Sequence, residues 1–318
     1  KTHEDDVLSA RFKSTELEYK LFCDFREYSK EFVTKIREIA DCIAKCDVYA
    51  GLAQAAVENN YCKPIIDDSD DFIIKNGRHA VLEKILPLGE YVANDLELKC
   101  NSSDSTQFMI LTGPNMAGKS TYMRQNALIA ILAQIGSWVP ADFAKIGIID
   151  KIFTRVGASD DLTLGQSTFM VEMIETACIL NSATDRSFIL LDEIGRGTST
   201  YDGVAIAWSV AEYIATKIKA RCIFATHYHE LNVMTKTYPQ IKNYRITISE
   251  ENGEIEFLRK IVQGGASKSY GIQVAKMAGL PNAVIRRSED LMTRMQRDFS
   301  NNLATRKKYA DTPSVDIP

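Results

Sequence analysis

Apolar side chains recur at every third or fourth position along the N-terminal part of the chain. This spacing runs from about Ser14 to Asn59 without a proline. Because a helix has about 3.6 residues per turn, the spacing places the apolar side chains on one face and predicts helix. The stretch is long for one globular helix, so we expect an antiparallel hairpin or a helical arm joined to the next domain. The face of an ordinary helical bundle is the alternative.

The pattern changes at Pro64, where the acidic run "DDSDD" breaks the helix and short β-like pieces follow. From Gln107 onward, short apolar runs alternate with stretches of helical periodicity. The apolar runs predict strands at Phe108–Leu111, Ile148–Phe153, Phe188–Leu191 and Cys222–Ala225. The stretches between them predict helices at about Lys119–Ile135, Thr168–Ala183, Gly203–Ile218 and His229–Thr237. Because such strands are buried on both faces, the alternation favours an α/β fold with a mostly parallel sheet flanked by helices.

The last third of the chain adds a hairpin and a helical end. "YRITISEENGEIEFLRKI" alternates with period two around Asn252-Gly253, which predicts a β-hairpin. The segment after Ser269 predicts a short helix, a break at Gly279-Leu280-Pro281 and a second helix. We therefore expect four parts: a helical segment at 1–62, an α/β domain at 63–268, a helical element at 269–300 and a flexible tail at 301–318.

Composition adds little to this picture but argues against some classes of protein, such as membrane and secreted proteins. The 318 residues are 45% apolar and 25% charged, and the formal net charge of −4 neither indicates nor excludes nucleic acid. We expect no membrane span and no signal peptide, and a start without Met suggests a piece of a longer protein. Seven scattered cysteines without a CxxC pair favour free thiols of a cytosolic protein. Cys42 and Cys46 could form half of a metal site, but no second pair accompanies them.

The segment "TGPNMAGKST", Thr112–Thr121, has the spacing of a phosphate-binding loop between a strand and a helix. Gly113 and Gly118 let the backbone turn so that successive N–H groups point at an anion. Lys119 would reach the terminal phosphates, and the Ser120 hydroxyl would ligate Mg²⁺. We expect the other loop residues to line the binding site of the same anion: Pro114, Asn115, Met116, Ala117 and Thr121.

Two further apolar strands end in polar residues that suit hydrolysis. "FILLDEIGRGTST" places Asp192 and Glu193 directly after a strand, where Asp192 would serve the Mg²⁺ shell and Glu193 would be the general base for water. We expect the two carboxylates to point differently, because successive side chains alternate along a strand. His227 ends the run "IFATHYHE", where it could sense the γ-phosphate or act only as a local hydrogen-bonding group.

Ser167 and Thr168, in "DDLTLGQSTFMVEM", precede a predicted helix whose first N–H groups lack partners. Such a helix start attracts an anion. Simple capping of the helix explains the two residues equally well. A functional alternative is that this helix start closes on the nucleotide of another subunit.

The chemistry-bearing segments together match a known family. They are "TGPNMAGKSTYMRQ", "TRVGASDD", "GQSTFMVEM", "LLDEIGRGTSTYDG", "FATHYHEL" and "GGASKSYGIQVAKMAGLP". In this order and spacing they resemble the MutS family of DNA mismatch repair ATPases. "GRHAVLE" and "EYVAND" resemble the segment that leads into that family's nucleotide site. The resemblance extends from the N-terminal helices to about Arg297.

This resemblance implies a P-loop NTPase fold of the ABC type that binds ATP or ADP with Mg²⁺. Lys119 and Ser120 resemble the Walker lysine and the magnesium serine. Asp192 and Glu193 resemble the magnesium-shell acid and the catalytic base, and His227 resembles the switch histidine.

The family also implies a homodimer with composite ATP sites. Asn115 matches an asparagine near the γ-phosphate, and Ser167 matches the signature serine that reaches the partner's nucleotide. Tyr91 stands where the family stacks an aromatic ring on adenine, usually phenylalanine, with Val92 beside it. By the same resemblance, residues 1–62 look like the base of a lever, and 269 to about 297 look like a dimerisation element.

Partners of the full-length protein follow from the resemblance as well. They are mismatched double-stranded DNA and a downstream repair factor of the MutL type, for a cytoplasmic protein. The family's mismatch-reading Phe-x-Glu segment has no matching context here, because "FRE" at Phe25–Glu27 lies inside a predicted helix. We therefore expect ATP hydrolysis from this chain, without mismatch selection by this chain alone.

Two other functions remain open. The first is a nucleotide-binding domain of a transporter or of another DNA-repair ABC ATPase, although those carry an L-S-G-G-Q signature where this chain has "LTLGQST". The second is a non-catalytic module that binds ATP to hold a shape, and Glu193 argues against it.

Overall fold

The computed structural model describes most of the chain in two compact units. Its backbone divides into Lys1–Tyr61 and Cys62–Pro318. The described residues are 2–87, 89–100, 105–115, 117–156, 168–251, 254–265 and 270–294. The tail expected at 301–318 therefore lies outside them.

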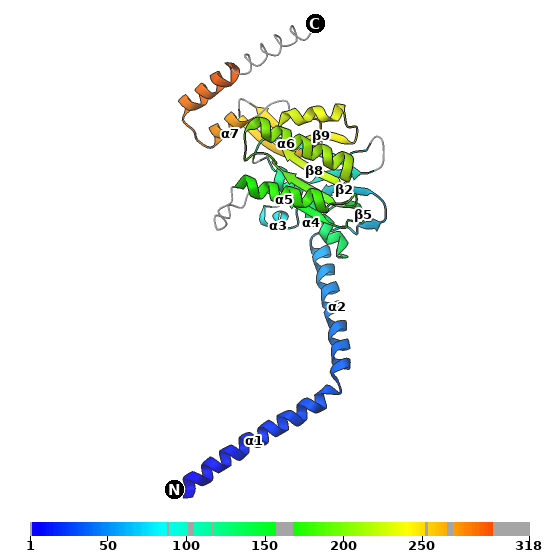
Figure 1. Ribbon diagram of the computed structural model, residues 1–318, viewed down its shortest axis with the longest axis vertical. Helices are drawn as coiled ribbons and strands as arrows, with labels where there is room; N and C mark the ends of the chain where they lie inside the picture. The colour runs from blue at the N-terminus through cyan, green and yellow to red at the C-terminus, as the bar shows by residue number, and fades with distance from the viewer. Residues whose placement is uncertain are drawn as a thin grey trace, which may run out of the picture. The chain divides into compact units, whose positions relative to one another are not determined.

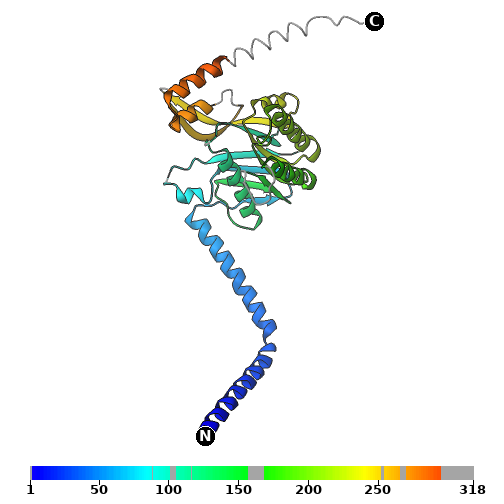
Figure 2. The ribbon, with the colours of Figure 1, turned by 60° about the vertical axis from the view of Figure 1, so that its left-hand side comes forward.

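The first unit consists of two successive helices, α1 (Thr2–Lys30) and α2 (Val33–Glu58), drawn in blue in Figure 2. A turn separates them, in which the Glu31 and Phe32 N–H groups donate to carbonyls of the last turn of α1. Large apolar side chains of both helices stay exposed within this unit, among them Phe12, Phe22, Ile39 and Ile43. An antiparallel hairpin would cover such side chains, so this alternative is wrong for the described helices.

The second unit is built on a six-stranded sheet with the order β10-β9-β4-β8-β7-β6. All neighbouring strands are parallel except β10, which pairs antiparallel with β9. The expected α/β fold with a mostly parallel sheet is confirmed. The strands are β4 (Phe108–Thr112), β6 (Ile152–Arg155), β7 (Phe188–Asp192), β8 (Arg221–Thr226), β9 (Ile241–Glu251) and β10 (Glu254–Gln263).

A second sheet, of which the sequence patterns indicated only short β-like pieces after Pro64, has the order β1-β5-β2-β3. Its strands are β1 (Ile65–Asp67), β2 (Asp71–Gly77), β3 (Asn94–Lys99) and β5 (Phe143–Gly147). The strand predicted at Ile148–Phe153 is confirmed only at Ile152–Phe153, because residues 148–151 cross from one sheet to the other. β5 ends at Gly147 in the second sheet, and β6 starts at Ile152 in the first.

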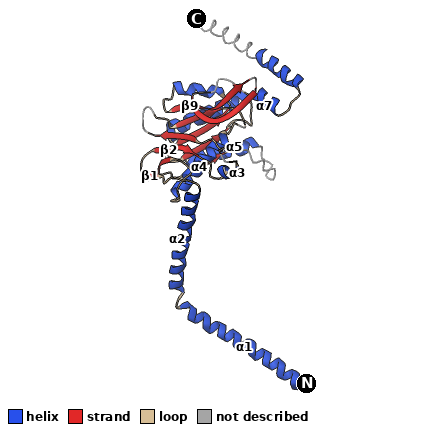
Figure 3. Ribbon diagram, turned by 180° about the vertical axis from the view of Figure 1, so that it is seen from behind, coloured by secondary structure: helices blue, strands red, loops and turns tan. Residues whose placement is uncertain are grey.

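Helices cover both faces of the six-stranded sheet (Figures 1 and 3). Met109 and Leu111 of β4 join a core with α4 and the second sheet, and Phe72 stacks edge-on against Phe188 with ring centroids 4.7 Å apart. Phe108 and Ile110, on the other face of the same strand, join a core with α5, α6 and the helical turns that follow them. Successive side chains of β4 therefore pack into cores on opposite faces of the sheet. This explains why β4 has no exposed residue.

The helices lie close to their predicted positions. α4 spans Lys119–Gln134 and α5 spans Thr168–Ser182. α6 spans Thr200–Tyr213 and starts earlier than predicted, because Ser199 caps it by accepting a hydrogen bond from the Asp202 N–H. The remaining helical elements of the described residues are α3 (Leu82–Ile85), the π-helix η2 (Ile214–Ile218), the 3₁₀-helix η3 (His229–Lys236), α7 (Gly271–Met277) and a helix whose described residues are 282–294.

Two negative findings hold for the described residues. No helix among them is long and apolar enough to cross a bilayer. Groups of three or more His, Cys, Asp and Glu side chains that could hold a metal ion are absent from that part of the chain, so Cys42 and Cys46 gain no further ligands there. All seven cysteines are free thiols in the structure.

Candidate functional site

The carboxyl ends of three neighbouring strands bring the sequence motifs together. Thr112 of β4 pairs with Thr226 of β8, and Asp192 of β7 pairs with Ala225 of β8. The glycine-lysine loop, the acid pair and His227 therefore leave the sheet side by side. Ligands of open parallel sheets bind at this edge.

The loop after β4 wraps around the ammonium group of Lys119. Gly113 and Gly118 have positive φ angles of +152° and +107°, and α4 starts directly after Gly118. Lys119 Nζ donates to the Gly113 oxygen at 2.8 Å and to the Pro114 oxygen at 3.1 Å, and lies 3.4 Å from Asn115 Oδ1. Only 5% of Lys119 is exposed. Burial lowers the pKa of its ammonium, although the Glu193 and Asp192 carboxylates act in the opposite direction.

Ser120 and Asp192 form an oxygen pair next to this lysine. Ser120 Oγ donates to Asp192 Oδ2 at 2.6 Å. Burial raises the pKa of the Asp192 carboxyl, against the effect of the Ser120 hydrogen bond. A hydroxyl and a carboxylate are ligands that Mg²⁺ prefers, so these residues fit a magnesium ion.

Both residues line a cavity of about 310 Å³. The loop residues Pro114, Asn115, Gly118, Lys119, Ser120 and Thr121 form one side, and Asp192, Glu193 and Arg196 form the other. Ala117, within the loop, is fully buried and does not line this cavity. Met116 and Ser167, both expected at the site, lie outside the described residues, as does the proposed helix cap at Ser167.

Glu193 points into this cavity for a reason other than the predicted one. β7 ends at Asp192, so strand alternation does not set the direction of Glu193. Instead, Glu193 takes a left-handed conformation with φ +55°, and its N–H donates to the Ala225 oxygen at 2.9 Å. Its carboxylate lies 3.9 Å from Lys119 Nζ and pairs closely with the Arg196 guanidinium.

His227 lies at a second, adjoining cavity of about 410 Å³. Asn115, Glu193 and Arg196 line both cavities, and His227, His229 and Tyr270 line only the second. The His227 ring lies 4.3 Å from the Tyr228 ring. Desolvation lowers the pKa of the His227 imidazole, which favours its neutral form near neutral pH.

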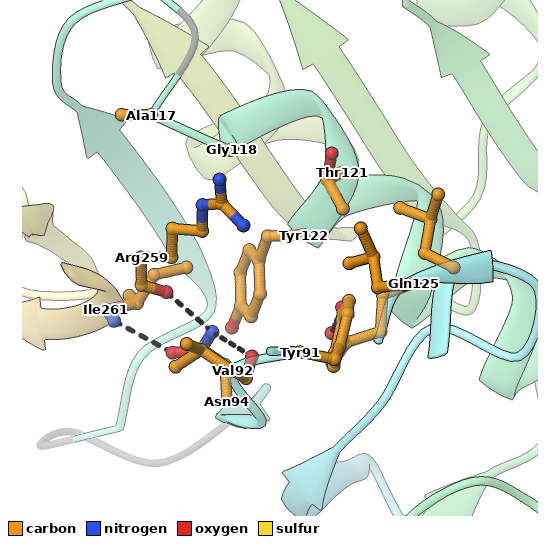
Figure 4. Close-up of a pocket in the computed structure, with 12 residues that line it drawn as sticks. Tyr91, Val92, Asn94, Ala117, Gly118, Thr121, Tyr122, Gln125, Arg259 and Ile261 are labelled. Carbon is orange, nitrogen blue, oxygen red and sulfur yellow. Dashed lines mark hydrogen bonds between the residues drawn. The ribbon is translucent and has the colours of Figure 1, made fainter. Parts of the chain in front are cut away.

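A third cavity, of about 270 Å³, lies beyond the glycine-lysine loop (Figure 4). Gly118 and Thr121 line both this cavity and the one around Lys119, so the two adjoin. Tyr91 and Val92 line it. Tyr91 Oη donates to Gln125 Oε1 at 2.6 Å, and burial raises the pKa of Tyr91 to about 12.

The sequence analysis missed the residues that close this third cavity. Asn94, which is 4% exposed, donates to the Val92 oxygen at 3.2 Å and to the Arg259 oxygen at 2.9 Å, and accepts from the Ile261 N–H at 2.8 Å. These bonds appear as dashed lines in Figure 4. They hold a bulge of β10, where Arg259 has φ +54°, against the segment that carries Tyr91. Arg259 thereby becomes a wall of the cavity.

Comparison with known proteins identifies the family of this chain and individual proteins that it resembles. The family model described as MutS domain V matches residues 109–296, which is more than half of the chain. The chain belongs to the MutS family.

Individual relatives agree with this match. The DNA mismatch repair protein MutS of Clostridium botulinum strain Hall is 50% identical over 322 residues, which cover 100% of this chain and 34% of that protein. The DNA mismatch repair protein MutS of Caldicellulosiruptor saccharolyticus is 52% identical over 295 residues, covering 92% of this chain and 34% of that protein. The chain thus spans about a third of the length of the curated relatives it matches.

Proposed function

We propose that this chain is the ATP-hydrolysing portion of a MutS-type DNA mismatch repair protein, with a P-loop of the ABC type. One observation carries the proposal. Lys119, the Ser120–Asp192 pair and Glu193 meet in a single cavity at the carboxyl edge of a parallel sheet. The family match favours this function over a transporter domain.

Phosphate binding is the first step that the geometry supports. Lys119 Nζ is already withdrawn from water and held by carbonyl oxygens of the loop. A phosphate oxygen carries more negative charge than a carbonyl, so the ammonium would prefer it as a partner. The start of α4 adds its positive helix end to the same place. Ser120 and Asp192 would hold Mg²⁺, which neutralises charge on the terminal phosphates.

Hydrolysis needs a group that takes a proton from water. The position of Glu193 supports this role, because its carboxylate lines the same cavity as Lys119. The water oxygen would attack the terminal phosphorus, the bond to the bridging oxygen of ADP would break, and Glu193 would accept the water's proton. Lys119 would stabilise charge on the transferred group. His227, neutral and close to Glu193, could accept or donate one hydrogen bond to the water or the phosphate.

The third cavity suits the adenine base. The Tyr91 ring supplies a stacking face, Arg259 supplies a flat cation on another wall, and the Val92 backbone is at hand for hydrogen bonds. Stacking on aromatic rings and on guanidinium planes is a common way to hold a base.

Substitution of Tyr91 tests whether the third cavity holds the adenine base. Changing Tyr91 to alanine should weaken ATP, ADP and AMP binding alike by about 10- to 100-fold, since stacking on one aromatic ring contributes roughly 1–3 kcal/mol. Tyr91→Phe keeps the ring and loses only the bond to Gln125, so its affinity should stay within about threefold. Calorimetric titration gives the constants. Unchanged affinity in the alanine variant would remove the base from this cavity.

Composite sites between two copies of the chain are the second part of the proposal. Ser167 of one copy would reach the phosphate held by Lys119 of the other, as the family resemblance implies. In the full-length protein, this ATP cycle would switch a clamp on mismatched DNA and recruit a repair factor of the MutL type, in the cytoplasm.

Light scattering of the chain tests the composite site. With Mg²⁺ and a non-hydrolysable ATP analogue, the measured mass should double at micromolar concentration, and with ADP it should return toward one copy. The analogue adds a γ-phosphate that the partner's Ser167 can bind, which ADP lacks. One constant mass for a single copy in both nucleotides, at saturating concentration, would contradict pairing through the nucleotide.

A further inference from the structure

One peptide group beside the proposed base is held from both sides. The Gly195 N–H donates to Glu172 Oε1 at 2.6 Å, and the Gly195 oxygen accepts from Tyr228 Oη at 2.9 Å. Both bonds are buried. Gly195 lies two residues after Glu193 in the loop that follows β7. The loop that carries Glu193 is therefore tied to α5 through Glu172 and to the end of β8 through Tyr228.

Glu172 is an unusual side chain for this place. It lies on α5 with 7% of its surface exposed, among apolar neighbours of the run "FMVEM". Its second carboxylate oxygen lies 3.9 Å from Nη2 of Arg155, which is also buried. Arg155 Nε lies 2.8 Å from the exposed Glu175, so the guanidinium is oriented by two acids. A carboxylate that accepts from a backbone N–H in such surroundings forms a strong, charge-assisted bond.

The loop has little freedom to move without α5. Gly195 has φ +90°, and a Cβ there would meet the Gly203 oxygen at 2.5 Å, at the start of α6. A Cβ on Gly197 would meet Phe169 of α5 at 2.9 Å. The loop thus lies against the first turn of α5 at Gly197 and is hydrogen-bonded to the next turn at Gly195.

We propose that Glu172 is a positioning residue, which keeps the loop after β7 in the conformation that directs Glu193 at the nucleotide. Glu193 stands in a left-handed conformation that a residue with a side chain normally avoids. Fixing the Gly195 peptide two residues later restricts the rotations by which the loop could relax. Because α5 begins at Thr168, the same bond couples any shift of that helix start to the proposed base.

The inference rests on the proposed hydrolysis, and kinetics test it first. Glu172→Ala in the full chain should lower kcat by about 10- to 100-fold and leave KM for ATP within about twofold, since small misplacements of a reacting group have effects of this size. Glu172→Gln keeps an oxygen that can accept from Gly195, and should recover most of the loss. Cys178→Ala is the control on the same helix, because Cys178 is exposed, and its kcat should equal that of the unaltered chain.

Amide hydrogen exchange gives a readout that needs no hydrolysis. Exchange of the Gly195 N–H should quicken by at least about tenfold in Glu172→Ala and stay unchanged in Cys178→Ala. Tyr228→Phe removes the bond on the other side of the same peptide and should lower kcat in the same direction, with KM again unchanged.

Each outcome decides one of the two proposals. If the unaltered chain does not hydrolyse ATP, the proposed function fails whatever the exchange shows. If the unaltered chain is active and Glu172→Ala keeps its kcat despite faster exchange at Gly195, the positioning role is wrong. A joint loss of kcat, nucleotide affinity and thermal stability that glutamine does not rescue would assign Glu172 a purely structural role and also overturn the inference.

Discussion

Glu193→Gln should lower ATP turnover by about 10²- to 10⁴-fold, the usual contribution of a positioned general base. Glutamine has nearly the same shape but cannot accept the proton of the attacking water. ATP binding should stay within about threefold, because Lys119 and the loop around it remain intact. Steady-state hydrolysis and equilibrium binding of ATP measure the two effects separately, and the variant should accumulate as an ATP complex.

Glu230→Gln is a suitable control for this variant. Glu230 is an exposed carboxylate close in sequence to His227, but it lines none of the three cavities. Its removal changes the local charge without touching the proposed chemistry, so turnover should be unaffected. Equal turnover in Glu193→Gln and the unaltered chain would refute the base assignment. An unaltered chain that binds ATP without hydrolysing it would favour the non-catalytic module instead.

Lys119→Met should weaken ATP and ADP binding by about 10²- to 10³-fold, in line with the roughly 2–5 kcal/mol lost when a buried charged partner is truncated. Methionine fills a similar volume but leaves the phosphates without their buried cation. AMP lacks the β- and γ-phosphates that Lys119 would reach, so its affinity should change by less than about threefold. Titrations with the three nucleotides therefore separate the role of Lys119 from that of Tyr91.

Lys236→Met serves as the control, because Lys236 is an exposed lysine on η3 that lines none of the three cavities. All three affinities should match those of the unaltered chain. An equal loss of ATP, ADP and AMP affinity in Lys119→Met, with a lowered melting temperature, would point to collapse of the loop. ATP affinity that stays intact in a folded Lys119→Met variant would remove the basis of the proposed function.

The central parallel strands could be predicted because each one is marked by a short apolar run in the sequence. Phe108–Leu111, Phe188–Leu191 and Cys222–Ala225 are apolar runs, and runs of this kind form strands buried on both faces. Each is followed by polar residues, and the parallel arrangement brings those residues to one edge. The meeting of the glycine-lysine loop with Asp192 and Glu193 could therefore be anticipated from the parallel arrangement of the strands.

The second sheet and the wall of the third cavity depend on distant pairings that leave no local pattern. β1 has only three residues, and β5 pairs with β1 and β2 from far along the chain. Asn94 and Arg259 are 165 positions apart when they bond. The bulge that turns Arg259 toward the cavity interrupts an otherwise regular hairpin register. None of these contacts follows from the spacing of apolar residues.

Glu172 was also missed by the sequence analysis, although the sequence around it does contain a signal. A single carboxylate within the apolar run "FMVEM" of a predicted helix suggests a buried charge with a partner. The partners, however, are a backbone N–H in another loop and an arginine on β6. The pattern could flag the residue as important, but only the fold identifies what it holds.

The backbone torsion of Glu193 links the stability of the fold to the proposed hydrolysis. A left-handed backbone costs an ordinary residue about 1 kcal/mol compared with glycine, and the energy must come from the rest of the protein. The stability of the fold and the proposed catalytic position of Glu193 therefore depend on the same backbone torsion. A chain with a less stable interior would have a smaller reserve to keep this carboxylate in its unfavourable geometry, and would lose its activity before it lost its shape.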